Sequence, residues 1–144
     1  MFNRLLQKFK SNKKPENFYQ ILGEEKGIQE IVDRFYEIME TDETASDCLK
    51  AHELIDNRIP KDVKIKLVMF LSGWLGGPNL FQQKYGHPRM RARHMHVKIG
   101  RKEKEQWLYC MEKALNSVSI KIKRKHKKSF LSSATALATR IQNI

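Results

Sequence analysis

Apolar residues recur every three or four positions along most of the chain, and this spacing predicts α-helices. The clearest helix covers about residues 25–40, and its apolar face consists of Ile28, Ile31, Val32, Phe35 and Met39. A second helix begins at Pro60, with a face made of Val63, Leu67, Phe70, Leu71 and Trp74. It ends at Gly76-Gly77-Pro78, because two glycines followed by proline cannot continue a helix.

The rest of the chain adds shorter helices and one long polar segment. Pro15 is expected to open a short helix that Gly23 closes. Further helices are predicted at about 80–85, in a basic turn ending at His94, at 102–118, and from Phe130 to Ile141. Residues 41–59 are polar and irregular, which predicts a loop with at most one helical turn. Because no segment alternates as a strand does, we expect an all-α domain of five or six helices.

The length of 144 residues suggests one domain with a real core. The longest apolar stretch, about residues 68–75, contains serine and glycine and is far too short to span a bilayer. The basic N-terminus has scattered apolar residues and no cleavage site, so we expect no signal peptide and a cytoplasmic protein.

The net charge of +12 is concentrated in two segments. Residues 1–14 hold five basic residues and 121–128 hold six, neither with an acidic residue, and the remainder is almost neutral. We therefore treat residues 1–14 as a basic amphipathic extension and 15–144 as the globular domain. In the extension an apolar stripe has the spacing of a surface helix that contacts anionic membrane: Phe2, Leu5, Leu6 and Phe9. An extra packed helix and a frayed tail are the alternatives.

Two classes of binding site, one for nucleic acid and one for zinc, are suggested by parts of the sequence. The basic run at 120–128 would suit a helical nucleic-acid-binding module, but charge alone supplies non-specific affinity and no recognition motif accompanies it. Such a run is more often a solvated loop, so we expect no specific nucleic acid partner. Cys48 and Cys110 lack the spacing of a zinc site, and we expect both thiols to be buried and reduced.

One histidine lies in a setting that suits a haem ligand. Residues 86–94 read Gly-His-Pro-Arg-Met-Arg-Ala-Arg-His. The Nε2 atom of His94 could bind iron while Nδ1–H donates to a backbone carbonyl. Arg91 and Arg93 could then pair with the haem propionates. Local spacing alone, however, favours an ordinary surface histidine on a basic turn.

A longer series of motifs favours a haem ligand over an ordinary surface histidine at this position. Arg34-Phe35-Tyr36 is followed by Phe-Leu-Ser-Gly-Trp-Leu-Gly-Gly-Pro at 70–78 and by Gly-His-Pro at 86–88. Arg-Ala-Arg-His follows at 91–94 and Gln-Trp-Leu-Tyr-Cys-Met at 106–111. In this order the chain resembles the group II truncated haemoglobins. The resemblance covers about residues 16–118, with a weaker match in the last helix.

The resemblance implies a shortened globin in which two helices pack over two around haem b. It implies that His94 is the proximal iron ligand, and that Tyr36 and Trp107 donate hydrogen bonds to the bound gas. Without the resemblance, Tyr36 and Trp107 would be interpreted as core residues at helical spacing. The further haem contacts expected on this basis are Phe35, Val63, Leu67, Phe81, Met90, Arg91, Arg93, Met95, Val97 and Met111.

Two departures from the family pattern affect the expected site. Val97 is smaller than the aromatic residue expected there, which predicts a looser proximal wall. The segment 41–60 is longer than usual, so its third ligand-facing residue is either His52 or Leu49. We favour His52, which would donate to the ligand or bind iron from the distal side.

The resemblance also implies the function. We expect reversible binding of dioxygen, and of nitric oxide or carbon monoxide, at a five-coordinate ferrous haem. The same iron and donors would suit oxidation of nitric oxide by dioxygen or reduction of peroxide, and the sequence does not choose among these. An enzyme of this kind would need a separate reductase, because no flavin-binding domain fits in this chain.

Overall fold

The computed structural model describes residues 16–144, and the extension predicted over residues 1–14, with its membrane-contacting stripe, lies outside them. The helices of the described part are α2 (Phe18–Ile21), α3 (Glu24–Thr41), η1 (Glu43–Ala45), α4 (Ser46–Lys50), α5 (Lys61–Trp74), α6 (Leu80–Tyr85), α7 (Met90–His94), α8 (Arg101–Ser117) and α9 (Arg124–Ile141). Within residues 16–144 there is no strand, which confirms the all-α prediction. In the same part, no helix is both long and apolar enough to cross a membrane.

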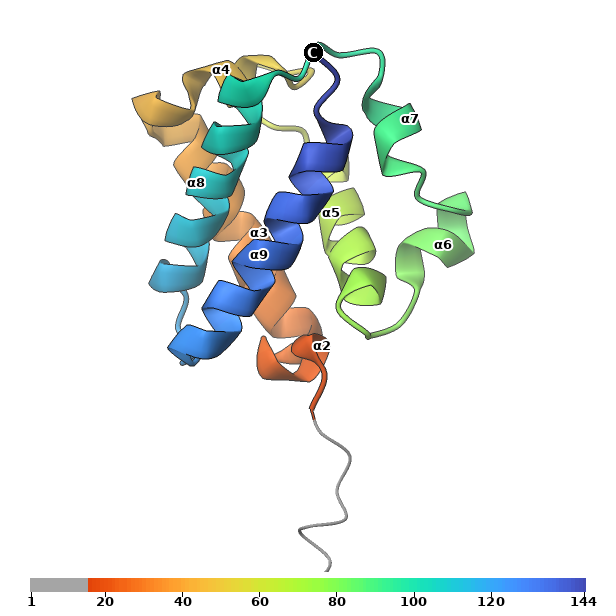
Figure 1. Cartoon of the computed structure of the whole chain (residues 1–144), viewed down its shortest axis with the longest axis vertical. Coiled ribbons are helices and arrows are strands. Elements are labelled where there is room, and N and C mark those ends of the chain that lie inside the picture. Colours follow the sequence, from red (N-terminus) through yellow and green to blue (C-terminus); the bar gives the residue numbers. More distant parts are fainter. Residues whose placement is uncertain (1–15) are drawn as a thin grey trace, which may run out of the picture.

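The long helices form two pairs, one packed over the other (Figure 1). Helix α3 packs on α5 in one pair and on α8, across the layers, while α8 packs on α9. The short helices attach to this frame, with α6 against α5, α7 against α9, and α4 against both α3 and α8. The apolar face of α3 lies at the centre of the core, and Ile28, Ile31, Val32 and Phe35 are each at most 1% exposed.

The first turn of the described chain is shorter than the sequence predicted. Helix α2 begins at Phe18 rather than near Pro15, because Asn17 caps it: the Asn17 side chain accepts from the Gln20 amide at 2.9 Å. Gly23 then joins α2 to α3 with a positive φ of 91°, a conformation that glycine adopts without strain.

The Gly-Gly-Pro turn after α5 is needed for more than ending a helix. A Cβ atom on Gly77 would lie 2.3 Å from the Tyr19 ring, so only glycine admits this side chain. The Tyr19 amide also donates to the Leu75 carbonyl at 3.0 Å. The turn therefore holds α2 against the end of α5.

Two segments are more helical than the sequence predicted. The polar segment 41–59 contains η1 and α4, and Asp42 starts η1 by accepting from the Thr44 amide at 3.0 Å. The basic run was expected to be a loop, but residues 124–128 form the first turns of α9. The apolar face of α9, which includes Phe130 and Ala134, buries one side of the helix and leaves basic side chains outside.

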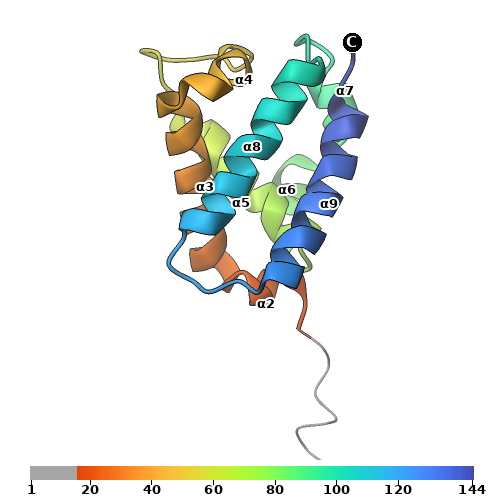
Figure 2. The same ribbon diagram turned by 60° about the vertical axis from the view of Figure 1, so that its left-hand side comes forward.

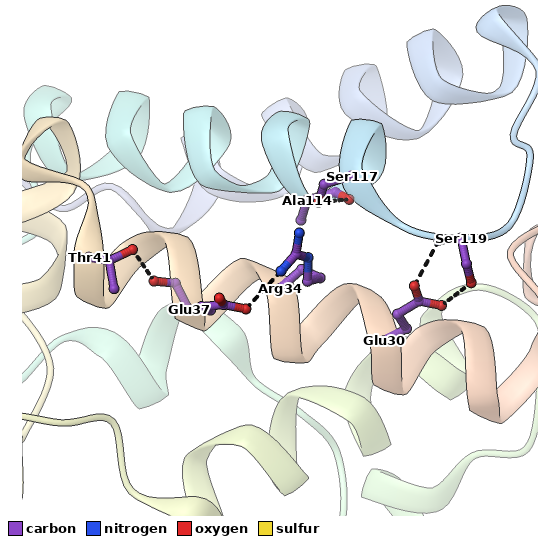
Figure 3. Close-up of polar contacts among 7 residues, drawn as sticks. All are labelled: Glu30, Arg34, Glu37, Thr41, Ala114, Ser117 and Ser119. Carbon is purple, nitrogen blue, oxygen red and sulfur yellow. Dashed lines mark hydrogen bonds and ion pairs between the residues drawn. The ribbon is translucent and has the colours of Figure 1, made fainter.

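The connection from α8 to α9 is tied to α3 by a charged contact (Figure 3). Both oxygens of Glu30 accept from Ser119, one from its amide at 2.7 Å and one from its hydroxyl at 2.8 Å. These bonds hold the pKa of Glu30 below its usual value. Further along α3, Glu37 accepts from Arg34 through its carboxylate and from the Thr41 hydroxyl through its backbone carbonyl.

Candidate functional site

His94 lies at the end of α7 with one ring nitrogen already engaged. Its Nδ1 lies 2.6 Å from the Met90 carbonyl oxygen one turn earlier. A carbonyl only accepts, so Nδ1 carries the proton and donates, and Nε2 keeps a free lone pair. This is the arrangement that the sequence predicted for a metal-binding imidazole.

Helix α7 is attached to the end of α9 by Arg91. The Arg91 guanidinium donates to the carbonyls of Arg140 and Gln142 at 2.9 and 3.1 Å. These carbonyls lie in the last turn of α9, where a cation is favourable. Arg91 therefore holds α7 against α9. Its guanidinium, which was predicted to pair with a haem propionate, is bound to these two carbonyls instead.

Asn143 fastens the chain that follows His94. Its side-chain amide donates to the carbonyls of His94 and Val97 at 3.2 and 2.8 Å. Its carbonyl oxygen accepts from the Ile99 amide at 2.9 Å. One side chain near the C-terminus thus holds the backbone on both sides of the α7–α8 turn. We call this contact set the Asn143 clamp.

An aromatic cluster from α3 and α8 brings together three of the predicted residues. Phe35 lies edge-on to Tyr36 with ring centroids 4.8 Å apart, and edge-on to Trp107 at 5.2 Å. Tyr36 is 4% exposed. Burial, with a smaller contribution from Cys48, raises its pKa, so the phenol remains a donor at neutral pH.

The polar atoms of this cluster have no protein partner among residues 16–144. Neither the Tyr36 hydroxyl nor the Trp107 indole N–H is hydrogen-bonded there, and neither is sealed inside the core. Buried phenol and indole groups usually find a partner. Two accessible donors beside Phe35 are therefore free to bind a polar ligand.

His52 completes the cluster from the far end of α4. Its ring is perpendicular to Tyr36 with centroids 6.0 Å apart, and its Nδ1 lies 2.8 Å from the Cys48 carbonyl. Burial lowers the pKa of His52 and outweighs the hydrogen bond to the Cys48 carbonyl, which raises it, so the neutral ring is favoured at pH 7. Leu49 is half-buried against the core. The structure therefore places His52 against Tyr36.

Gln106 positions α4, and the sequence analysis missed it. Its side-chain carbonyl accepts from the Cys48 amide at 2.8 Å, and its NH₂ group donates to Asp47 at 2.8 Å. Gln106 precedes Trp107 on α8, so one turn of α8 orients both Trp107 and helix α4, which ends two residues before His52. No local pattern signals a partner 58 residues away.

A second cluster lies between α5, α6 and α7. Phe81 packs edge-on to Phe70 at 6.4 Å, and the Arg93 guanidinium lies 5.0 Å above the Phe81 ring. Arg93 also donates to the Tyr85 carbonyl at 3.3 Å, and the Lys66 ammonium lies 5.5 Å from the Tyr85 ring. Lys66 was missed, although it follows Val63 by three residues on the same helix face.

The other predicted contacts are spread over the same helices. Val63, Leu67 and Met90 are half-buried against the core, Val97 is half-buried, and Met111 is fully buried. Met95 is 55% exposed. A hollow of about 190 Å³ that is open to solvent lies between α2, α5 and α9 and touches none of these residues, and it is smaller than the roughly 300–1,000 Å³ of ligand pockets.

The two cysteines are buried and free, as predicted. Burial, reinforced by a neighbouring charge, raises the pKa of each thiol to about 12. Within residues 16–144, no group of three His, Cys, Asp or Glu side chains is placed to hold a metal ion. An iron ion bound by His94 would therefore need further ligands that these side chains do not supply.

These residues fit a haem. One imidazole nitrogen is free at His94 while the other is fixed, as an axial ligand requires. Aromatic and aliphatic walls come from α3, α5 and α6, and Arg93 and Lys66 supply cations for carboxylates. The unpartnered donors of Tyr36 and Trp107 belong to α3 and α8, whereas His94, the predicted iron ligand, belongs to α7.

Comparison with known proteins gives consistent matches. The bacterial-like globin family matches residues 17–143. Group 2 truncated hemoglobin YjbI of Bacillus subtilis is 33% identical over 105 residues, which is 71% of each chain.

Solved structures agree over nearly the whole chain. The cold-adapted truncated hemoglobin of Pseudoalteromonas haloplanktis is 38% identical, with a TM-score of 0.80 over 90% of this chain and 99% of that one. The group II 2-on-2 hemoglobin of Agrobacterium tumefaciens is 28% identical, with a TM-score of 0.81 over 92% and 98%.

Proposed function

The chain belongs to the bacterial-like globin family and is a group II truncated haemoglobin, which holds a haem iron and binds diatomic gases. On this basis we propose that it binds dioxygen reversibly, with His94 as the proximal ligand of the iron. The observation that carries this proposal is the pair of unpartnered donors, the Tyr36 hydroxyl and the Trp107 indole N–H, beside Phe35. A ferrous haem supplies reversible binding of dioxygen, nitric oxide and carbon monoxide.

On the proximal side the protein fixes the imidazole before it binds iron. The Met90 carbonyl sets the tautomer and the rotation of the His94 ring. Arg91 holds α7 on α9, and the Asn143 clamp holds the turn after it. These contacts keep Nε2 at a constant position.

On the distal side the protein favours a polar gas. A haem held here would polarise dioxygen, which would then accept hydrogen bonds strongly, whereas carbon monoxide would accept them poorly. Tyr36 and Trp107 are proposed to donate to dioxygen. His52 packs against Tyr36, but its Nδ1–H donates to the Cys48 carbonyl, so Nε2 of the neutral ring has no proton to donate. Phe35 packs against both rings and limits their rotation.

The propionates require cations at the edge of the haem. We assign this role to Arg93, as the sequence predicted, and add Lys66, because both lie at Tyr85. Arg91 is not assigned to a propionate, since its guanidinium binds two carbonyls of α9.

Redox chemistry is a second candidate function that uses the same residues. Oxidation of nitric oxide and reduction of peroxide would both use hydrogen-bond donors beside the iron, and Tyr36 with Trp107 supplies such donors. Turnover would require a separate reductase as partner. Consumption of nitric oxide by the dioxygen-loaded protein, followed optically, measures this activity.

An absorption spectrum tests the haem and its ligand. The ferrous protein, with and without carbon monoxide, is expected to give the spectra of a histidine-ligated haem. His94→Ala should lose haem or bind it weakly, whereas His87→Ala, which changes an exposed histidine in the connection before α7, should keep it. A normal five-coordinate histidine spectrum in His94→Ala would refute the assignment.

A further inference from the structure

Two half-buried imidazoles are held in the same way. The Nδ1 atom of His52 lies 2.8 Å from the carbonyl oxygen of Cys48, four residues earlier. The Nδ1 atom of His94 lies 2.6 Å from the carbonyl oxygen of Met90, also four residues earlier. A carbonyl only accepts, so in both neutral rings Nδ1 carries the proton and Nε2 keeps a lone pair. The arrangement that suits His94 as an iron ligand is thus present a second time, at His52.

The other three histidines, which also lie in residues 16–144, are held differently. His87 is exposed, and its Nδ1 accepts from the Arg89 amide at 3.1 Å, so the proton of its neutral ring lies on Nε2. His96 is exposed, and the ring of His126 lies edge-on to Phe18 with centroids 6.1 Å apart. Within the described chain, His52 alone repeats the hydrogen bond of His94.

His52 and His94 belong to the same end of the molecule. Helix α4 ends two residues before His52 and helix α7 ends at His94, and both helices lie at this end in Figure 1 and in Figure 2. Burial is the main cause that lowers the pKa of His52, and the charge of His94 lowers it too. A charge has such an effect only at short range. The two imidazoles are therefore neighbours in one site.

The backbone at His52 is fixed on one side and lies outside the helices on the other. Gln106 holds α4 by accepting from the Cys48 amide at 2.8 Å. The His52 amide donates to the Leu49 carbonyl at 3.1 Å. After His52, the chain forms no further helix until Lys61. The His52 ring can therefore move at this junction without unfolding α4.

Two other side chains beside His52 carry atoms that bind iron in proteins, but both are protonated. Metal ions bind Cys and Tyr in the deprotonated form and His as the neutral ring. Burial raises the pKa of Tyr36, whose ring lies edge-on to His52 with centroids 6.0 Å apart. Burial also raises the pKa of the Cys48 thiol to about 12. Of the three side chains, His52 is the one in its metal-binding form at neutral pH.

We propose that His52 binds the haem iron through Nε2 when no gas is present, on the face opposite His94. This inference rests on the proposed function, because it needs a haem held by His94, and it departs from the five-coordinate iron that the sequence led us to expect. His52 must leave before a gas binds, and its departure transfers neither an electron nor a proton. His52 therefore competes with the gas, and the apparent affinity is reduced by the fraction of molecules in which the position is open.

Electron paramagnetic resonance and absorption spectra of the ferric protein at neutral pH test the proposal. The axial ligands set the electronic state of the iron, and two imidazoles give a low-spin iron whereas one imidazole with water gives a high-spin iron. The test variant is His52→Leu, which keeps an apolar side chain in this half-buried position. The matched control is His87→Leu, which removes an exposed imidazole with the opposite tautomer.

Wild type and His87→Leu should be low-spin, whereas His52→Leu should be high-spin and keep its haem. When the ferrous proteins are mixed with carbon monoxide, the rate for wild type should level off at high concentration, because His52 must leave first. At low concentration His52→Leu should react about ten-fold faster, as expected if His52 is bound in about nine of every ten molecules. Circular dichroism should show the same helix content in all three proteins.

A high-spin wild-type protein would overturn the inference and leave the proposed function intact. A low-spin signal that persists in His52→Leu and disappears in Tyr36→Phe would also overturn it, because the phenol oxygen would then be the sixth ligand. Equal rates of carbon monoxide binding in wild type and His52→Leu would show that His52 does not compete with the gas. Absence of haem from every variant and from wild type would overturn the proposed function and this inference with it.

Discussion

The Asn143 clamp predicts that a residue next to the C-terminus controls how firmly His94 holds the haem. Asn143→Ala removes three side-chain hydrogen bonds, to the Ile99 amide and to the carbonyls of Val97 and His94. The Asn143 amide still donates to the Ile99 carbonyl at 2.9 Å, so the end of the chain is not released. The change therefore acts on the turn after α7 rather than on α9.

The size of the effect follows from the contacts. Two of the bonds have good lengths, 2.8 and 2.9 Å, and the third is longer at 3.2 Å. At about 0.5–1.5 kcal/mol for each of the two shorter bonds, and little for the longer one, the loss is about 1–3 kcal/mol. Because these bonds hold the backbone at His94, their loss should weaken the binding of haem, and haem should dissociate about ten- to a hundred-fold faster.

Transfer of haem to an excess of apomyoglobin measures this rate optically. Gln142→Ala is the matched control, because its side chain bonds only to the Ile144 carbonyl while its backbone still accepts from Arg91. A wild-type transfer rate in Asn143→Ala, or equal acceleration in both variants, would show that the clamp does not position His94.

Three further predictions concern the distal side and the acid stability of the fold. Tyr36→Phe and Trp107→Phe should each release dioxygen about ten- to a hundred-fold faster, non-additively if they share one network, with little change for carbon monoxide; unchanged rates in stopped-flow displacement would make both residues packing only. Gln106→Leu should destabilise the fold by about 1–3 kcal/mol, measured by urea unfolding. It should also speed dioxygen release, because α4 would no longer hold His52 against the Tyr36 ring; a stability loss without a kinetic change would limit Gln106 to the fold. The hydrogen bond from the Tyr109 hydroxyl, followed by those from the Thr44 amide and Lys113, lowers the pKa of Asp42 below its usual 3.8. The stability that this carboxylate contributes is therefore present above pH 3.8 and is lost as the pH falls further. The difference in thermal midpoint between wild type and Asp42→Asn should shrink below about pH 3.8, and a constant difference would contradict this linkage.

The sequence by itself determined the helices and, through the resemblance, the family. Helical periodicity, proline starts and glycine stops act over a few residues, so α3, α5 and α8 lie close to where the pattern predicted them. Shorter elements were less well predicted, because α4 and the start of α9 depend on contacts outside their own segments. The residues of the candidate site came from an ordered series of motifs, since no local spacing distinguishes Tyr36 or Trp107 from core residues.

The tertiary structure decided which of these residues meet and what holds them. It placed His52 against Tyr36 and turned Arg91 toward α9. It also revealed Gln106 and Asn143, whose partners lie 58 and 49 residues away. Such bonds depend on the packing of helices far apart in the chain. A hydrogen bond between distant residues produces no repeating pattern in the sequence, whereas an amphipathic helix places an apolar residue every three or four positions.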